Sequence, residues 1–154
     1  DALCELAERA QSVKDKLLRA VDEDTEAFNE VIAGIRMPKD TAEQLEVRSR
    51  VIRAGYRTAA QVPLETARPC REVLDLCRMA ADIGNEAVMS DAGVGALMAY
   101  AGVQSAIHNV RINLPHTKDP AFMAQVSSEL GELLDESKSI CDAVQRDVIH
   151  SFGA

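Results

Sequence analysis

One carboxylate lies where the hydrophobic pattern of the sequence requires an apolar side chain. Asp24 continues the three-four spacing that runs through Leu17 and Ala20, so it falls on the apolar stripe of a predicted helix. A carboxylate on a buried stripe is costly unless it is paired, hydrogen-bonded or functional. Burial would also tune such a group for proton transfer. Asp24 is therefore a candidate catalytic residue, and a satisfied structural carboxylate is the alternative.

A second set of polar residues lies on one face of the segment 90–113. Positions three or four apart share a helix face, and here they are Asp91, Gly95, Met98, Gly102, Ala106, Asn109 and Asn113. A glycine inside a helix costs about 1 kcal/mol relative to alanine, so the glycines of this segment need a reason. Close approach of two helices is one reason. The other is a slot for a flat ligand, whose polar edge Asn109 and Asn113 would bind. Asp91 is the first candidate for a general base or a cation-stabilising group, and Asp24 is the second.

Other residue types give weaker signals. Lys39 lies in the turn R-M-P-K, where such residues are usually solvated but could receive an acidic tail at a pocket mouth. The three histidines are scattered, and the four cysteines lack zinc spacing, so no metal is expected. No serine or cysteine has the sequence context of a catalytic nucleophile.

Helical periodicity runs through almost the whole chain. It predicts helices over about 2–35, 42–83, 90–113 and 120–150. The start signals are a Thr41–Gln44 capping box, Ser90 and Asp119, and the stop signals are Pro38, Gly84–Asn85 and Pro115. Pro63 and Pro69 predict a kink or a short break in the second helix. We expect one all-α domain over residues 1–154, an antiparallel bundle of about four long helices.

Composition limits the function classes. The chain has 154 residues, 47% hydrophobic, and a formal net charge of -8, which argues against nucleic-acid binding and against an anionic membrane surface. Free thiols and the lack of a signal peptide favour the cytoplasm. Apolar stripes along the full length of the helices predict a homo-oligomer, at least a dimer.

Several segments together resemble one family of folate enzymes, the cyclodeaminase/cyclohydrolase family. They are V-D-E-D-T-E-A-F-N-E-V (21–31), R-M-P-K (36–39), A-x-x-P-L-E-T-A (60–67), G-N (84–85), S-D-A-G-V-G-A-L (90–97) and N-V-R-I-N-L (109–114). Their order and spacing agree with the family over about residues 1–145. The likeness is strongest to the cyclodeaminase part of formiminotransferase-cyclodeaminases.

The resemblance implies an all-α fold, homo-oligomerisation and a tetrahydrofolate derivative as substrate. A cyclodeaminase converts 5-formiminotetrahydrofolate to 5,10-methenyltetrahydrofolate and ammonia, as in histidine degradation. A cyclohydrolase interconverts the methenyl and 10-formyl forms. The resemblance places Asp24, Asn85, Asp91, Asn109 and Asn113 in one cleft. The asparagines would bind the pterin edge, and Lys39 would meet the acidic tail.

The family's Gly-rich first segment and first helix are absent, so we expect a domain without that helix. An upstream formiminotransferase domain is a further expected partner. The sequence leaves three readings open: cyclodeaminase, cyclohydrolase and a non-catalytic helical module that only oligomerises.

Overall fold

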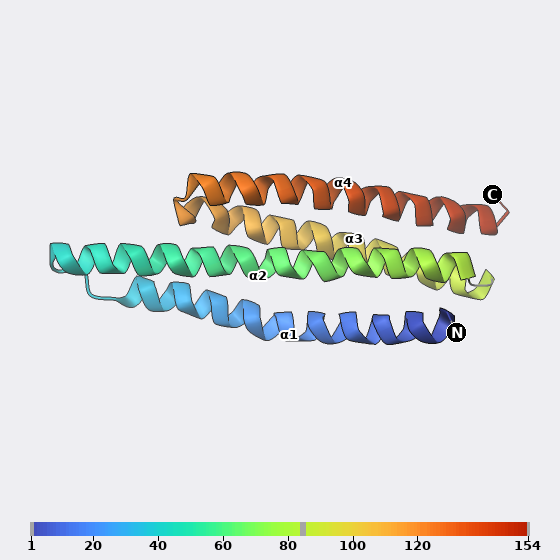
Figure 1. Ribbon diagram of the computed structural model, residues 1–154, viewed down its shortest axis with the longest axis horizontal. Coiled ribbons are helices and arrows are strands. Elements are labelled where there is room, and N and C mark those ends of the chain that lie inside the picture. Colours follow the sequence, from blue (N-terminus) through green and yellow to red (C-terminus); the bar gives the residue numbers. More distant parts are fainter. Residues whose placement is uncertain (1, 84–85, 154) are drawn as a thin grey trace.

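The computed structural model describes residues 2–83 and 86–153, which form four long antiparallel helices (Figure 1). These are α1 (Ala2–Arg36), α2 (Ala42–Ile83), α3 (Glu86–Asn113) and α4 (Pro120–Ser151), with a short 3₁₀ helix, η1 (Leu114–Thr117), between α3 and α4. The described residues contain no strand. The predicted all-α antiparallel bundle is confirmed. No helix in the described ranges is long and apolar enough to cross a membrane.

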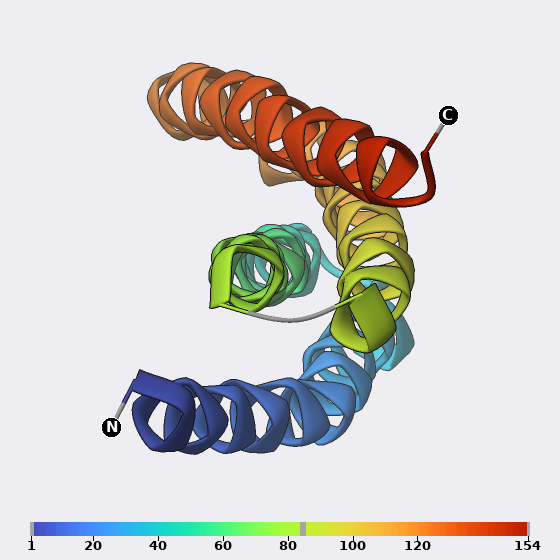
Figure 2. The same cartoon turned by 90° about the vertical axis from the view of Figure 1, so that its right-hand side faces the viewer.

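Helix α2 is the centre of the bundle. It contacts α1, α3, η1 and α4, whereas α1 contacts α2 alone among the described elements. Viewed end-on, α1, α3 and α4 form an arc around α2 (Figure 2). The backbones of α1 and α3 do not come close to each other, and pockets lined by side chains of both helices lie between them, next to α2.

Two of the predicted helix starts have the expected hydrogen bonds. At α2 the backbone amide of Gln44 donates to Thr41 Oγ1 over 3.2 Å. The backbone amide of Thr41 donates to Gln44 Oε1 over 3.3 Å, so the two residues form a reciprocal capping box. At α4 the Phe122 amide donates to Asp119 Oδ1 over 3.0 Å. This bond and the guanidinium of Arg57 lower the pKa of the Asp119 carboxyl below its ordinary value.

Two predictions about helix boundaries are wrong. Ser90 does not begin a helix, because α3 already starts at Glu86, and Asp91 therefore lies beyond the first turn. Of the kink or short break predicted at Pro63 and Pro69, the break is absent, since α2 is one continuous helix. The predicted stop at Gly84–Asn85 lies outside the described residues.

A side chain of α3 explains why α2 passes Pro63 unbroken. Proline has no amide hydrogen, so the Ala59 carbonyl four residues earlier loses its helical partner. Asn113 Nδ2 donates to this carbonyl over 2.9 Å and to the Asn109 carbonyl over 3.0 Å. The side-chain amide of Asn113, at the end of α3, thus replaces the backbone hydrogen bond that Pro63 removes.

The glycines of α3 allow close helix packing. A Cβ atom at Gly95 would lie 2.9 Å from Cys77 Sγ, and one at Gly102 would lie 3.0 Å from Cys70 Sγ, both on α2. The structure therefore supports the helix-packing reason for these glycines. Burial raises the pKa of the Cys70 and Cys77 thiols, so they behave as packing groups. Cys4, by contrast, is exposed.

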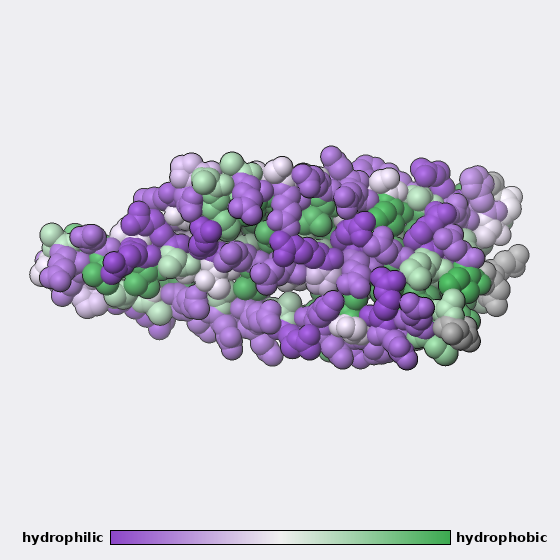
Figure 3. All heavy atoms as spheres, in the orientation of Figure 1, coloured by the Kyte–Doolittle hydropathy of each residue, from purple (hydrophilic) through white to green (hydrophobic). Residues whose placement is uncertain are grey.

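Ion pairs join α2 to α4, on the side of α2 that faces away from α1 (Figure 2). Four arginines of α2 face acidic groups of α4 and its cap; the pairs are Arg57–Asp119 (2.8 Å), Arg68–Glu129 (2.6 Å), Arg71–Glu136 (3.1 Å) and Arg78–Asp147 (2.6 Å). These side chains are partly exposed, so each pair contributes at most about 1 kcal/mol. Hydrophilic side chains cover most of the face shown in Figure 3.

We predict that Asn113→Ala lowers the free energy of unfolding by about 1–3 kcal/mol, because it leaves the Ala59 carbonyl without a partner. In a Pro63→Ala background, position 63 regains an amide hydrogen for that carbonyl. The same Asn113→Ala change should then cost less by about 1 kcal/mol. Urea unfolding of the four proteins measures both costs, and equal costs in the two backgrounds would contradict this account.

Candidate functional site

The open space between α1 and α3 is a groove whose floor is α2, here named the α1–α3 groove. Three pockets of about 620, 280 and 410 Å³ follow one another along it. Leu17 lines both the first and the second pocket, and Asp24 and Asn109 line both the second and the third. The three pockets therefore lie next to one another along the groove.

The third pocket combines aromatic rings with polar groups, and we name it the aromatic pocket. The rings of Tyr56, from α2, and His116, from η1, stack with their centroids 4.4 Å apart. Phe28 of α1 supplies a further ring, and Asp24 and Asn109 supply a carboxylate and an amide. Flat aromatic faces beside hydrogen-bonding groups suit a heterocyclic ligand with a polar edge.

Asp24 lies at the junction of the second and third pockets, where its carboxylate borders the groove. The expected burial is wrong, because Asp24 is exposed in the single chain. The apolar stripe to which it belongs does not pack fully on α2. Its neighbours Val21 and Phe28 remain 65% and 61% exposed, so this side of α1 borders the groove instead of the core.

The two asparagines of α3 lie in the same pocket as Asp24 but differ in their surroundings. Asn109 is exposed toward the groove. The amide nitrogen of Asn113 is held by the Ala59 and Asn109 carbonyls, which leaves its Oδ1 as the group available to a ligand. Asn109 therefore has both a donor and an acceptor to offer, whereas Asn113 offers an acceptor.

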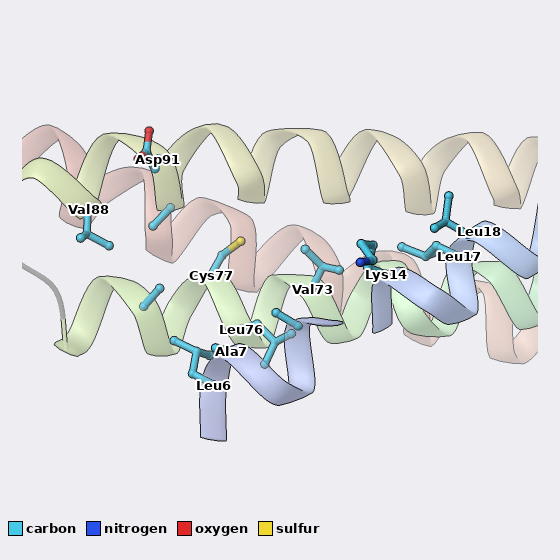
Figure 4. A pocket seen from close by; sticks show the side chains of 13 residues that line it. Leu6, Ala7, Lys14, Leu17, Leu18, Val73, Leu76, Cys77, Val88 and Asp91 are labelled. Carbon is cyan, nitrogen blue, oxygen red and sulfur yellow. The ribbon is translucent and has the colours of Figure 1, made fainter. Parts of the chain in front are cut away.

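Asp91 lies at the other end of the groove. It lines the first pocket, on the wall opposite Leu6 and Ala7 of α1 (Figure 4). Asp91 and Asn109 are 18 residues apart, which is five turns and about 27 Å along the helix axis. They share a helix face as expected, but one chain does not bring them into one cleft.

The remaining expected site residues do not join this group. Lys39 lies exposed in the turn between α1 and α2 and lines none of the pockets along the groove. Asn85 lies outside the described residues. A separate basic pocket of about 470 Å³ is lined by residues that are close in sequence to those of the aromatic pocket. Its cationic lining residues are Arg50, Arg53, Arg57 and Lys118.

Sequence reasoning missed Tyr56 and His116. They are 60 residues apart in the chain, and neither lies in a motif that suggests stacking. The sequence is poor in aromatic residues, at 3%. This scarcity is a usable signal, because an aromatic residue in such a chain is more informative than in an average one.

Comparison with known proteins gives concordant matches. The family model of formiminotransferase-cyclodeaminase matches residues 1–132. The chain is 37% identical over 146 residues to a methenyltetrahydrofolate cyclohydrolase of Methylorubrum extorquens, covering 95% of this chain and 70% of that protein. It is 36% identical over 124 residues to the formimidoyltransferase-cyclodeaminase of Gallus gallus, covering 80% of this chain but only 23% of that protein.

A solved structure has the same fold. The crystal structure of a formiminotetrahydrofolate cyclodeaminase from Thermotoga maritima superposes with a TM-score of 0.80 at 22% identity, covering 93% of this chain and 67% of that one. On the strength of the family match over most of its length, this chain belongs to the formiminotransferase-cyclodeaminase family.

Proposed function

We propose that this chain is a folate-dependent one-carbon enzyme that closes 5-formiminotetrahydrofolate to 5,10-methenyltetrahydrofolate and releases ammonia. The observation that carries the proposal is the aromatic pocket, where Asp24 and Asn109 lie beside the stacked rings of Tyr56 and His116. The pterin would pack against the rings, and Asn109 with Asn113 Oδ1 would bind its polar edge.

The reaction requires a group that transfers one proton and stabilises a positive charge. N10 of the substrate attacks the formimino carbon on N5, and the resulting tetrahedral carbon expels ammonia. A carboxylate can take the proton from N10 and return it to the departing nitrogen. The product carries a positive charge on the N5–C–N10 bridge, which a nearby carboxylate stabilises. We assign these roles first to Asp24, which borders the aromatic pocket, and keep Asp91, which lines the other end of the groove, as the second candidate.

The second candidate reaction is the hydrolysis of 5,10-methenyltetrahydrofolate to the 10-formyl form. It is favoured by the similarity to the cyclohydrolase from Methylorubrum extorquens, which is 37% identical and matches 95% of the length of this chain. The nucleophile there is water in place of N10, and the same carboxylates would activate it. Ammonia release from the formimino substrate, compared with loss of the methenyl substrate, separates the two reactions. A non-catalytic module would show neither reaction and no stabilisation by tetrahydrofolate.

For the acidic tail of the substrate we propose two cationic positions. Lys39 is the expected one, and Arg53 and Lys118 in the basic pocket are the other. Lys118 follows His116 of the aromatic pocket by two residues. We compare Lys39→Ala with Arg53→Ala. If one of these variants raises KM without lowering kcat, the residue that it replaces binds the tail. An upstream formiminotransferase domain, a role in histidine degradation and a cytoplasmic location stay predictions.

We predict that Asp24→Asn and Asp91→Asn each reduce turnover by about a hundredfold or more, while folate binding persists. Each change keeps the shape of the side chain and removes its charge. Asp22→Asn is the matched control, because Asp22 is an exposed neighbour that lines none of the three groove pockets. Single-turnover assays with thermal-shift binding measure both quantities. Wild-type turnover in either variant would remove that residue from the catalytic group.

Loss of an aromatic face should act on binding instead. We predict that Tyr56→Ala and His116→Ala each weaken tetrahydrofolate binding about tenfold, the effect of losing one aromatic contact. Tyr56→Phe keeps the ring and should bind as the wild type does. His108→Ala is a second control, since His108 lines none of the groove pockets. Calorimetry decides the question, and equal affinity in all four variants would place the pterin elsewhere.

A further inference from the structure

The second of the three groove pockets, of about 280 Å³, has polar side chains from all three helices around it, and we name it the hydroxyl pocket. Asp24 comes from α1, Thr66 from α2, and Ser105 and Asn109 from α3. The other residues that line it are apolar, apart from the thiol of Cys70, and they include no lysine, arginine or histidine. The function proposed above gives no role to Thr66 or Ser105.

Both hydroxyl groups direct their single hydrogen atom to the backbone of their own helix. Thr66 Oγ1 donates to the Val62 carbonyl over 2.9 Å, and Ser105 Oγ donates to the Ala101 carbonyl over 2.8 Å. A carbonyl oxygen can only accept, so the hydrogen atom of each hydroxyl must lie in these bonds. Each oxygen keeps lone pairs for a ligand, and Thr66 and Ser105 therefore offer acceptors and no donor.

The hydroxyl pocket is consequently rich in acceptors. An ionised carboxylate also only accepts, so Asp24 adds to the acceptors of Thr66 and Ser105. Among the lining residues, Asn109 alone brings a side-chain N–H donor. Acceptors without a neighbouring lysine or arginine suit a ligand group that is positively charged and carries N–H donors. They disfavour a group that presents an oxygen lone pair, because two acceptors then face each other without a hydrogen between them.

The two candidate substrates differ in this property. The formimino group of 5-formiminotetrahydrofolate is an amidine, and its protonated form is a cation with N–H donors on the terminal nitrogen. The methenyl bridge of 5,10-methenyltetrahydrofolate is a cation too, but it has no N–H group. Acceptors in the hydroxyl pocket can form hydrogen bonds with the first group and cannot form them with the second.

We infer that Thr66 and Ser105 determine the specificity of the site for a one-carbon group that carries N–H donors, which is the formimino group. The inference rests on the proposed function, in which the one-carbon group lies beside Asp24. Asp24 lines the aromatic pocket and the hydroxyl pocket alike. A pterin in the aromatic pocket therefore has the hydroxyl pocket next to its reacting carbon.

A pair of ligands that differ in one terminal group tests this role. 5-Formiminotetrahydrofolate ends in a nitrogen that donates, and 5-formyltetrahydrofolate ends in an oxygen that accepts. Thr66→Val and Ser105→Ala each remove one hydroxyl and keep most of the side-chain shape. Each should lower kcat/KM for the formimino substrate about tenfold, the effect of losing one hydrogen bond to a charged group. The affinity for the formyl compound, measured by calorimetry, should stay equal or rise.

The informative quantity is the preference for the formimino over the formyl ligand, because a merely structural role would weaken both. Thr58→Val is the matched control. Thr58 Oγ1 makes the same kind of bond, to the Ala54 carbonyl over 3.4 Å, but Thr58 lines neither the groove pockets nor the basic pocket. Thr66→Ser retains the hydroxyl and should restore most of the preference that Thr66→Val loses. All variants must keep the helical circular dichroism of the parent.

Equal losses for both ligands, or a change in preference no larger than that of Thr58→Val, would overturn the assignment. If the wild type binds the formimino compound but releases no ammonia, the proposed reaction fails. Calorimetry with both ligands then still decides the role of the two hydroxyls. Binding of neither ligand by the wild type would overturn the proposed function and this inference together.

Discussion

The architecture depends on the continuity of α2. This helix holds α1 in place on its own, since α1 contacts no other described element, and it forms the floor of the groove between α1 and α3. A break at Pro63 would separate the part of α2 that carries Tyr56 from the part that packs against Gly95 and Gly102 of α3. The Asn113 hydrogen bond to the Ala59 carbonyl therefore supports both the fold and the pocket wall.

The contrast between the two sides of α2 explains where a ligand can bind. On one side, arginines of α2 pair with carboxylates of α4, and α4 also contacts α3, so this seam is closed. On the other side α1 and α3 stay apart, and their apolar side chains border a groove. An acidic protein that handles a cationic one-carbon bridge needs carboxylates without nearby arginine partners. Asp24 and Asp91, which have no ion pair among the described residues, lie on the open side.

Local sequence signals predicted what local physics decides. The reciprocal Thr41–Gln44 bonds and the Asp119 cap involve neighbours in the chain, so the sequence was sufficient to place the starts of α2 and α4. The break at Pro63 was wrongly predicted because its compensation comes from Asn113, which is 50 residues away. Ser90 failed as a cap because α3 begins one turn earlier. A capping residue favours a helix start but cannot prevent a helix from forming before it.

The candidate site also shows what sequence patterns can predict and what they cannot. Helical periodicity predicted one shared face for Asp91, Gly102 and Asn109, and all three line pockets of the groove, because periodicity fixes direction around the helix axis. It carries no restraint along the axis, where residues on the same face can be many turns apart. Direction and distance together are what a catalytic group requires. The 18-residue separation between Asp91 and Asn109 spans five turns of α3, so a shared helix face does not by itself make them one site.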